Sequence, residues 1–227
     1  MLLGCSACSS RFGAPDPISS QAEDIVDLWR LFIVASIVVY AIVGGLIVWS
    51  IVRYRRSHAG DPAAFREHIP LEIVYTAVPV VIVVGLFLAT YATERVVDSV
   101  SEDPDLVVDV TAFTWSWRFA YRDAGVVVTG VAGERPTLVL PQGRTVRISL
   151  TSADVIHSFY VPQLLFKRDA VPGRVTEFEI TPTRLGTFSG QCGEFCGLDH
   201  ARMLLAVRVV PAGEFDAWLA QRRPEAA

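Results

Sequence analysis

Two long stretches without a charged residue constrain this chain more than any other feature. They extend from Leu31 to Val52 and from Ile73 to Thr93, and most of their side chains are apolar. Because a helix rises ~1.5 Å per residue, about 20 such residues cross a hydrocarbon layer of ~30 Å. Two buried helices of this kind would need a larger soluble core than a chain of 227 residues can form. The sequence therefore predicts two membrane spans.

The charges beside the spans predict how the chain crosses the membrane. The loop at residues 53–70 is basic and contains Arg53, Arg55, Arg56 and Arg66. The segment ahead of the first span, residues 1–28, contains Asp16, Glu23, Asp24 and Asp27. Basic loops remain on the cytoplasmic side of a membrane. We therefore expect a cytoplasmic loop between the spans and both chain termini on the extracytoplasmic side.

The chain beyond the second span has the pattern of a β-rich domain. Residues 104–212 contain short runs rich in valine, threonine and aromatic residues, separated by glycine and proline. Several short strands at this spacing predict a sandwich or a barrel. The predicted fold class is membrane α+β, with a transmembrane hairpin at residues 29–95 and an all-β extracytoplasmic domain after it. Residues 213–227 are expected to form a closing helix and a tail.

A row of aromatic residues opens the predicted β domain. The row alternates with smaller or polar residues and consists of Phe113, Trp115, Trp117, Phe119 and Tyr121. On one strand, a period of two places all five rings on the same face. We expect most of these rings to belong to the core, and those near a strand end to meet a partner or carry electrons.

Charge and cysteine content exclude other classes of protein. The chain has 24 acidic and 20 basic residues, which argues against nucleic acid as a partner. Its 4 cysteines are too few for a disulfide-stapled miniprotein. The residues before Cys5 resemble a bacterial lipoprotein box, but neither a basic region nor an apolar stretch precedes them. Lipidation of Cys5 therefore stays open, and Cys8 has no assigned role.

The segment from residue 190 to residue 203 holds the side chains best suited to chemistry. It contains Cys192, Cys196, His200 and Met203, and His157 lies upstream. Thiolate, imidazole and thioether groups suit copper, whereas a zinc site has no use for a methionine. A mononuclear blue-copper site needs only one cysteine. Two thiolates can bridge two copper ions with one histidine on each, so the motif predicts a dinuclear centre.

Simpler explanations exist for each of these residues taken alone. Cys192 and Cys196 form a disulfide in one alternative, because the domain faces an oxidising compartment. His157 and Met203 are then ordinary core residues. The spacing of the whole set argues against that alternative.

With these motifs, the chain resembles subunit II of the haem-copper cytochrome c oxidases over nearly its whole length after the first twenty residues. The resemblance implies a bacterial plasma membrane and a Greek-key cupredoxin domain that holds the dinuclear CuA centre. It implies that Cys192 and Cys196 bridge the two coppers, while His157 and His200 each bind one of them. It also implies that no haem is bound to this chain, which has no Cys-x-x-Cys-His motif.

Four further positions take roles from the same resemblance. Met203 would be the axial ligand of one copper, and the backbone carbonyl of Glu194 would reach the other. The side chain of Glu194 would bind a magnesium ion shared with subunit I. Trp115 looks like the tryptophan that receives an electron from cytochrome c. Glu72 looks like the carboxylate at the mouth of a proton pathway, although a glutamate here is also explained by its place at the membrane interface.

The implied function is electron transfer from a c-type cytochrome through CuA to haem in subunit I, which reduces oxygen and pumps protons. Subunit III is a further implied partner. Ala120 occupies a place where the family often has glutamate. The acids that remain for a docking patch are Asp123, Glu134, Asp154 and Asp199. Because this patch is thin, we expect a donor that is membrane-bound or fused in a bc1 complex.

Two other classes of protein have a similar chain. A quinol oxidase subunit II has the same fold without the copper site, and the complete set of ligands argues against it. A membrane-anchored copper carrier binds metal but has no use for Glu72, the Glu194 carboxylate or Trp115. A nitrous oxide reductase carries the same kind of centre but needs a large catalytic domain for which this chain is too short.

Overall fold

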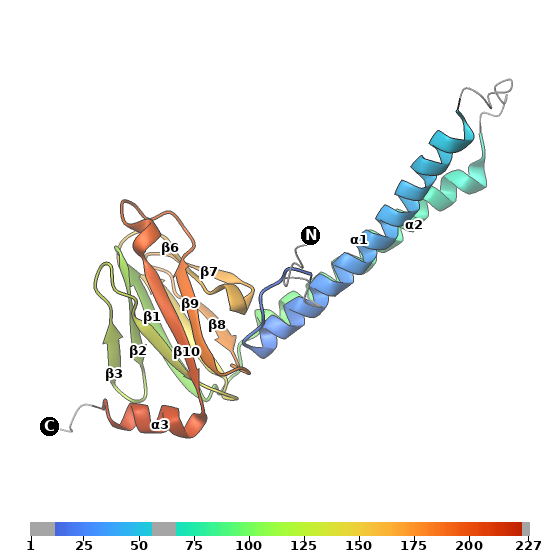
Figure 1. The fold of residues 1–227 in the computed structure, drawn as a ribbon. Helices are drawn as coiled ribbons and strands as arrows, with labels where there is room; N and C mark the ends of the chain where they lie inside the picture. The colour runs from blue at the N-terminus through green and yellow to red at the C-terminus, as the bar shows by residue number, and fades with distance from the viewer. Residues whose placement is uncertain (1–11, 56–66, 224–227) are drawn as a thin grey trace, which may run out of the picture. The chain divides into compact units, whose positions relative to one another are not determined.

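The computed structural model describes residues 12–55 and 67–223 (Figure 1). The chain divides into two compact units, a helical hairpin at residues 27–93 and a β domain that also includes residues 12–26. Cys5, Cys8, Arg56 and Arg66 lie outside the described residues. The expectations about lipidation and about most of the basic loop therefore stay predictions.

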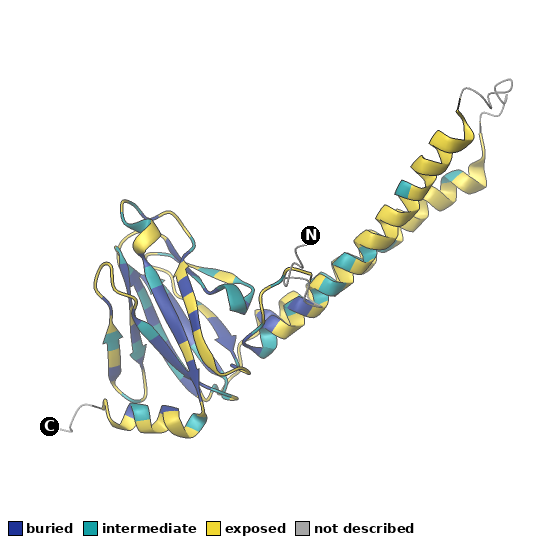
Figure 2. Ribbon diagram, in the orientation of Figure 1, coloured by how far each residue is buried: buried dark blue, intermediate teal, exposed yellow. Residues whose placement is uncertain are grey.

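The hairpin consists of two long helices that are apolar around their whole circumference. Helix α1 covers Ser20–Arg53 and α2 covers Ile69–Val97, so both contain the predicted spans. In each helix, no residue of the most apolar 18-residue window is buried inside the structure. Figure 2 shows both helices exposed along most of their length. Exposed apolar helices of this length need lipid or partner helices around them. The alternative of buried helices in a soluble core is wrong.

The β domain is a sandwich of two five-stranded sheets. The first sheet has the order β3-β2-β1-β5-β8, with bounds Val126–Thr129, Ser116–Tyr121, Leu106–Phe113, Val146–Ser152 and Thr176–Ile180. The second has the order β4-β10-β9-β6-β7, with bounds Thr137–Pro141, Leu204–Val210, Gly186–Cys192, His157–Tyr160 and Lys167–Ala170. Each sheet contains one parallel pair, β1 with β5 and β4 with β10. The predicted all-β sandwich is confirmed.

The core lies between the two sheets, as the alternating pattern of the strands requires. Along β1, buried and partly buried residues alternate at every position. On β2, the rings of Trp117, Phe119 and Tyr121 are fully buried. Figure 2 shows buried residues along the strands of both sheets. Since period two puts alternate side chains on one face, these rings fill the space between the sheets.

The predicted single face of five rings is wrong, because the chain reverses in the middle of the row. Strand β1 ends at Phe113 and β2 begins at Ser116, and these two residues are antiparallel partners. The residues between them, Thr114 and Trp115, form the turn. Phe113 follows the buried Ala112 and points away from the core face. Trp115 therefore lies in the hairpin turn at the edge of the core, whereas the fully buried rings lie on β2.

Two further segments complete the β domain. Helix α3, Ala212–Ala220, buries Phe215 and Leu219 and is the predicted closing helix. The N-terminal segment packs on the domain through Ile18, whose N–H donates to the Gln163 carbonyl at 3.2 Å. The Ile18 carbonyl in turn accepts from the N–H of Thr183 at 2.9 Å. The chain ahead of α1 is thus attached to the β domain by backbone hydrogen bonds.

Candidate metal centre

All five predicted side-chain ligands lie at one end of the sandwich. His157 is the first residue of β6, Cys192 is the last of β9, and the pairing of these strands brings them together. Cys196 lies in the loop that follows β9. His200 begins the short 3-10 helix His200–Arg202, and Met203 directly precedes β10. Two neighbouring strands and one connecting loop therefore supply the whole set.

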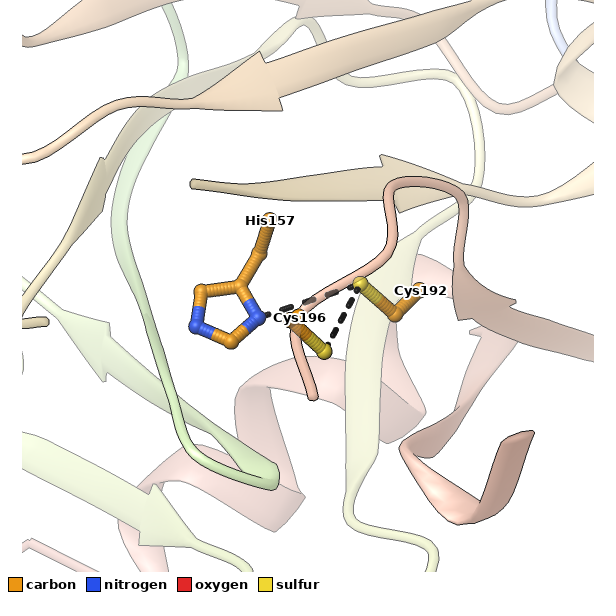
Figure 3. Close-up of side chains that lie close together, drawn as sticks. All are labelled: His157, Cys192 and Cys196. Atoms are coloured by element: carbon orange, nitrogen blue, oxygen red, sulfur yellow. Dashed lines mark hydrogen bonds between the residues drawn. The ribbon is translucent and has the colours of Figure 1, made fainter. Parts of the chain in front are cut away.

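Cys192 stands at the centre of one half of the cluster. Its Sγ lies 3.8 Å from Nδ1 of His157 and 3.2 Å from the backbone carbonyl oxygen of Glu194. His157 is completely buried and Cys192 is nearly so. Figure 3 shows the imidazole turned toward the two sulfurs. This half combines an imidazole, a thiol and a carbonyl around one point.

Cys196 stands at the centre of the other half. Its Sγ lies 3.6 Å from Nδ1 of His200 and 3.8 Å from Sδ of Met203. The Met203 side chain is completely buried, whereas His200 is half-buried beneath the ring of Phe195. This half combines an imidazole, a thiol and a thioether.

The two sulfurs are close without being bonded. They lie 3.9 Å apart (Figure 3), against ~2.05 Å in a disulfide. Both cysteines are free thiols, so the disulfide alternative is wrong. Ligands of one tetrahedral ion such as zinc stand ~3.3–3.8 Å apart, because the bonds are ~2.0–2.3 Å long. The spacing of this cluster fits metal coordination, and its soft His, Cys and Met donors fit copper.

The two thiols differ in acidity. Burial raises the pKa of Cys192, but hydrogen bonds with His157 and with the Glu194 and Ser158 backbone lower it to about 7. Burial and the nearby Cys192 charge raise the pKa of Cys196 to about 12. Because metals bind thiolates, the Cys196 proton has to leave before both sulfurs can be ligands.

Trp115 connects the molecular surface to the cluster. The ring is half-buried, and its Nε1–H donates a hydrogen bond to the carbonyl of Cys196 at 3.1 Å. Gly197 lies against this ring with a φ of +114°, and a Cβ there would stand 3.4 Å from the indole. A glycine is needed at this position because other residues rarely adopt that backbone conformation. The turn between β1 and β2 therefore places the tryptophan directly against the loop that carries Cys196.

Other predicted residues have contacts that sequence reasoning missed. The Glu194 carboxylate is exposed and lies 3.6 Å from Nζ of Lys167. Glu72 lies in the first turn of α2, where its Oε1 accepts a hydrogen bond from the N–H of His68 at 3.2 Å. A side chain that reaches back to the residue before a helix satisfies a free backbone donor. This capping role explains a glutamate at position 72 by local structure.

The acidic docking patch is thinner than the sequence indicates. Asp123 follows the end of β2, whereas Trp115 precedes its start, so the two lie at opposite ends of that strand. Asp199 lies 3.6 Å from the guanidinium of Arg202. Asp154 accepts hydrogen bonds from the N–H and the hydroxyl of Thr114. Few of the predicted acids are thus available to attract a basic partner.

Two strands near the cluster were also missed from the sequence. Strand β6 carries His157 and β7 pairs with it, but both are short. The sequence of β7, Lys-Arg-Asp-Ala, is too polar to predict a strand. In β6 the first three residues are all buried and Phe159 lies opposite Cys192, so no alternating pattern marks this strand in the sequence.

Comparison with known proteins identifies the same protein family for the hairpin and for the β domain. Residues 7–93 match the family described as cytochrome c oxidase subunit II, transmembrane domain, and residues 129–210 match its periplasmic domain. A probable cytochrome c oxidase subunit 2 of Streptomyces avermitilis is 38% identical over an alignment that covers 88% of this chain and 75% of that protein. The cytochrome c oxidase subunit 2 of Mycobacterium bovis is 32% identical, with coverage of 96% and 77%.

A solved structure resembles the β domain. The crystal structure of the periplasmic domain of subunit II of the cytochrome oxidase of Bradyrhizobium japonicum is 35% identical, with a TM-score of 0.50. The match covers 56% of this chain and 100% of that one. Together with the fold and the His, Cys and Met cluster, these matches show that the chain belongs to the cytochrome c oxidase subunit II family, as a membrane subunit with two transmembrane helices and a periplasmic cupredoxin-like domain.

Proposed function

We propose that this subunit receives electrons from a c-type cytochrome at a dinuclear CuA centre and passes them to haem in subunit I, which reduces oxygen and pumps protons. One observation carries the proposal. The Sγ atoms of Cys192 and Cys196 lie 3.9 Å apart as free thiols, and each has its own imidazole within 3.8 Å. A copper pair bridged by two thiolates supplies rapid one-electron transfer with little change in geometry.

The residues around the cluster divide the ligands between two metal positions. His157 and His200 would serve one position each, and Cys192 and Cys196 would be shared by both. The Glu194 carbonyl would complete one position and Met203 the other. Four of the five side chains are buried, so water has access to the cluster chiefly at His200.

The path for the incoming electron begins at Trp115. Its half-buried ring reaches the surface, and its indole N–H is bonded to the backbone of a cysteine ligand. The path therefore consists of one aromatic ring, one hydrogen bond and the backbone and side chain of Cys196.

The surface beside Trp115 favours a donor that is already held nearby. Leu198, which follows the glycine under the Trp115 ring, is 91% exposed, and Phe195 is 78% exposed. Exposed apolar side chains of this size mark contact surfaces for other proteins. With few free carboxylates beside them, long-range attraction of a basic protein is weak. These features support a c-type cytochrome that is membrane-bound or fused in a bc1 complex.

The attachment of the N-terminal segment supports the proposed orientation. Ile18 is bonded to the backbone of the β domain, so the chain ahead of α1 lies on the same side of the membrane as that domain. Two spans then return the chain to that side and leave residues 53–70 in the cytoplasm. In this orientation Glu72, in the first turn of α2, lies near the cytoplasmic face, where we place the mouth of a proton pathway.

Contacts with the rest of the oxidase complete the proposal. The helices of the hairpin are exposed, which suits contact with subunit I, subunit III and lipid. The Glu194 carboxylate is exposed beside the cluster, and its hard oxygens suit a magnesium ion shared with subunit I.

The first test counts the metal. We would load the full-length chain with copper in detergent, measure copper per chain and record its electron paramagnetic resonance. Two coppers that share one unpaired electron support the proposal. One copper with a single-nucleus signal, or a Cys192–Cys196 disulfide without metal, would sink it in favour of the carrier or the quinol oxidase subunit.

The second test separates electron transfer from metal storage. We would compare Trp115→Phe with Trp218→Phe, a matched substitution on α3, in the assembled oxidase. Reduction by a c-type cytochrome should slow about tenfold or more in the first variant only, with copper content unchanged in both. Equal rates would show that electrons do not enter through Trp115, and the absence of reduction in wild type would favour the copper carrier.

A further inference from the structure

One carboxylate joins the copper ligand His157 to the turn that carries Trp115. Asp154 lies in the loop between β5 and β6. Its Oδ1 lies 2.8 Å from Nε2 of His157, and its Oδ2 accepts from the N–H and Oγ1 of Thr114 at 2.6 and 2.7 Å. Thr114 directly precedes Trp115. One oxygen of Asp154 therefore faces His157, and the other faces the turn that carries Trp115.

The bond to Oδ1 decides which nitrogen of His157 carries the proton. An ionised carboxylate only accepts hydrogen bonds, so Nε2 must be the protonated nitrogen. In the neutral imidazole Nδ1 is then left with its lone pair, and it is the atom that lies 3.8 Å from Sγ of Cys192. A histidine that binds metal commonly donates its other N–H to a carboxylate, which fixes both tautomer and ring orientation.

The bonds to Oδ2 hold the turn. Thr114 donates from both its backbone and its hydroxyl, while the indole of Trp115 donates to the Cys196 carbonyl. The turn is thus attached to both halves of the cluster, on one side through Asp154 to His157 and on the other through Cys196.

The surroundings of Asp154 match this role better than a docking role. Its side chain is 31% exposed, and Oδ1 also accepts from the N–H of Val155 at 2.7 Å. Donors from His157, Thr114 and Val155 thus satisfy both carboxylate oxygens from within the domain.

We propose that Asp154 is a positioning residue that fixes the Nε2–H tautomer of His157 and holds the Thr114–Trp115 turn against that ligand. The inference rests on the proposed function for the roles of copper and Trp115. The tautomer of His157, however, is a property of the metal-free chain, so it can be tested even if the copper proposal fails.

The first arm of the experiment uses the metal-free chain. We would label the full-length protein in detergent with ¹⁵N-histidine and record the ring nitrogens of His157 in wild type, Asp154→Ala and Asp109→Asn. Asp109 is the matched control, because its carboxylate pairs with Arg122 and lies on β1. At a pH at which the imidazole is neutral, the wild type and control should show Nε2–H alone, and Asp154→Ala should show a mixture of tautomers. An unchanged tautomer in Asp154→Ala would overturn the proposal.

The second arm uses the copper-loaded chain. Asp154→Ala should weaken copper binding by roughly 10–100-fold and change the paramagnetic resonance spectrum, the usual effect of removing such a partner. Asp154→Asn should lose less, because its amide oxygen still accepts from His157. Thr114→Val should leave copper affinity unchanged but slow reduction by a c-type cytochrome.

The outcomes separate the two proposals. If wild type binds no copper pair while the tautomer shifts in Asp154→Ala, the proposed function fails and the positioning role stands. If Asp154→Ala changes neither tautomer nor copper affinity but weakens cytochrome binding in a salt-dependent way, Asp154 is a docking carboxylate and the inference is wrong.

Discussion

The two halves of the candidate metal centre are built in different ways. The half around Cys192 joins separate parts of the chain, because His157 lies on β6 and Cys192 on β9. The half around Cys196 lies within one segment, residues 196–203. His157 is completely buried and bonded to Asp154, whereas His200 is half-buried and lies on a single turn of 3-10 helix.

This difference shows which ligands are held in place by the strands of the sandwich. Strand pairing and the Asp154 carboxylate hold His157 in place before any metal arrives. The Cys196 half depends on the conformation of a loop, and loops adjust more easily than sheets. We therefore expect substitutions in the Cys192 half to weaken copper binding and to lower the free energy of unfolding. Substitutions in the Cys196 half should weaken copper binding alone.

The largest effect is expected where the two halves meet. Cys196→Ser should remove the shared sulfur, so copper per chain should fall from two to one or none and the shared-electron signal should disappear. The sandwich should stay folded, because Cys196 lies in a loop and its replacement keeps the shape. Circular dichroism and copper analysis check both points. Loss of the copper pair in Cys192→Ser but not in Cys196→Ser would contradict a bridging role for both.

The two histidines offer the most direct test of the comparison. His157→Ala and His200→Ala should each lose copper binding. His157→Ala should also lower the free energy of unfolding of the metal-free chain by roughly 2–3 kcal/mol, because it leaves a buried cavity and removes one hydrogen-bond donor from Asp154. His200→Ala should change it by about 0.5 kcal/mol or less. Denaturant titration checks this, and equal losses would mean that both halves depend equally on the fold.

Imidazole in solution should distinguish the same two positions. Added imidazole should restore copper binding to His200→Gly, where the site is half-exposed, but not to His157→Gly, where the cavity is sealed. Copper titration with and without imidazole measures the difference. Rescue of both variants would show that the His157 cavity opens readily.

A smaller effect is expected at Met203. Met203→Leu keeps a fully buried side chain of similar volume, so the free energy of unfolding should change by less than about 1.5 kcal/mol. The thioether is lost, and both coppers should stay bound with a shifted reduction potential. Redox titration beside copper counting checks this result. Loss of one copper would show that Met203 is an essential ligand rather than a weak axial one.

The smallest effect on copper is expected at the opposite end of the domain. The Tyr121 hydroxyl donates to the Val139 carbonyl at 2.9 Å and accepts from its N–H at 2.8 Å. Tyr121→Phe should leave copper binding unchanged and lower the free energy of unfolding by roughly 1–3 kcal/mol, because a buried donor loses its partner.

The pH dependence of the free energy of unfolding tests the same role of Tyr121. Burial raises the pKa of Tyr121 above its ordinary value near 10. The neutral phenol therefore stabilises the fold fully below about pH 10, and this stabilisation is lost as the pH rises further. Unfolding titrations from pH 8 to 11 should show this alkaline loss in wild type and a smaller one in Tyr121→Phe. Parallel curves would mean that Tyr121 ionises as easily in the folded state.

Sequence reasoning predicted the elements better than their connections. Strand pattern identified the sandwich, but the reversal at Thr114 and Trp115 was missed because the row of aromatic residues continues through it. The partner that holds this turn, Asp154, lies 40 positions away. Strand β7 was missed because polar residues form it, and its pairing with β6 rather than its composition makes it a strand.

The sequence by itself determined what depends on local composition. Hydropathy decided the two spans, because about 20 apolar residues suffice to cross a bilayer wherever they occur. The kinds of side chain decided that the candidate metal is soft or borderline. Tertiary structure alone decided which imidazole faces which sulfur, that the thiols at 192 and 196 are unbonded, and that Asp154 serves His157. His157 and Cys192 are 35 positions apart, and only the pairing of β6 with β9 brings them together. The other two distances depend on the conformation of loops, which the tertiary structure fixes.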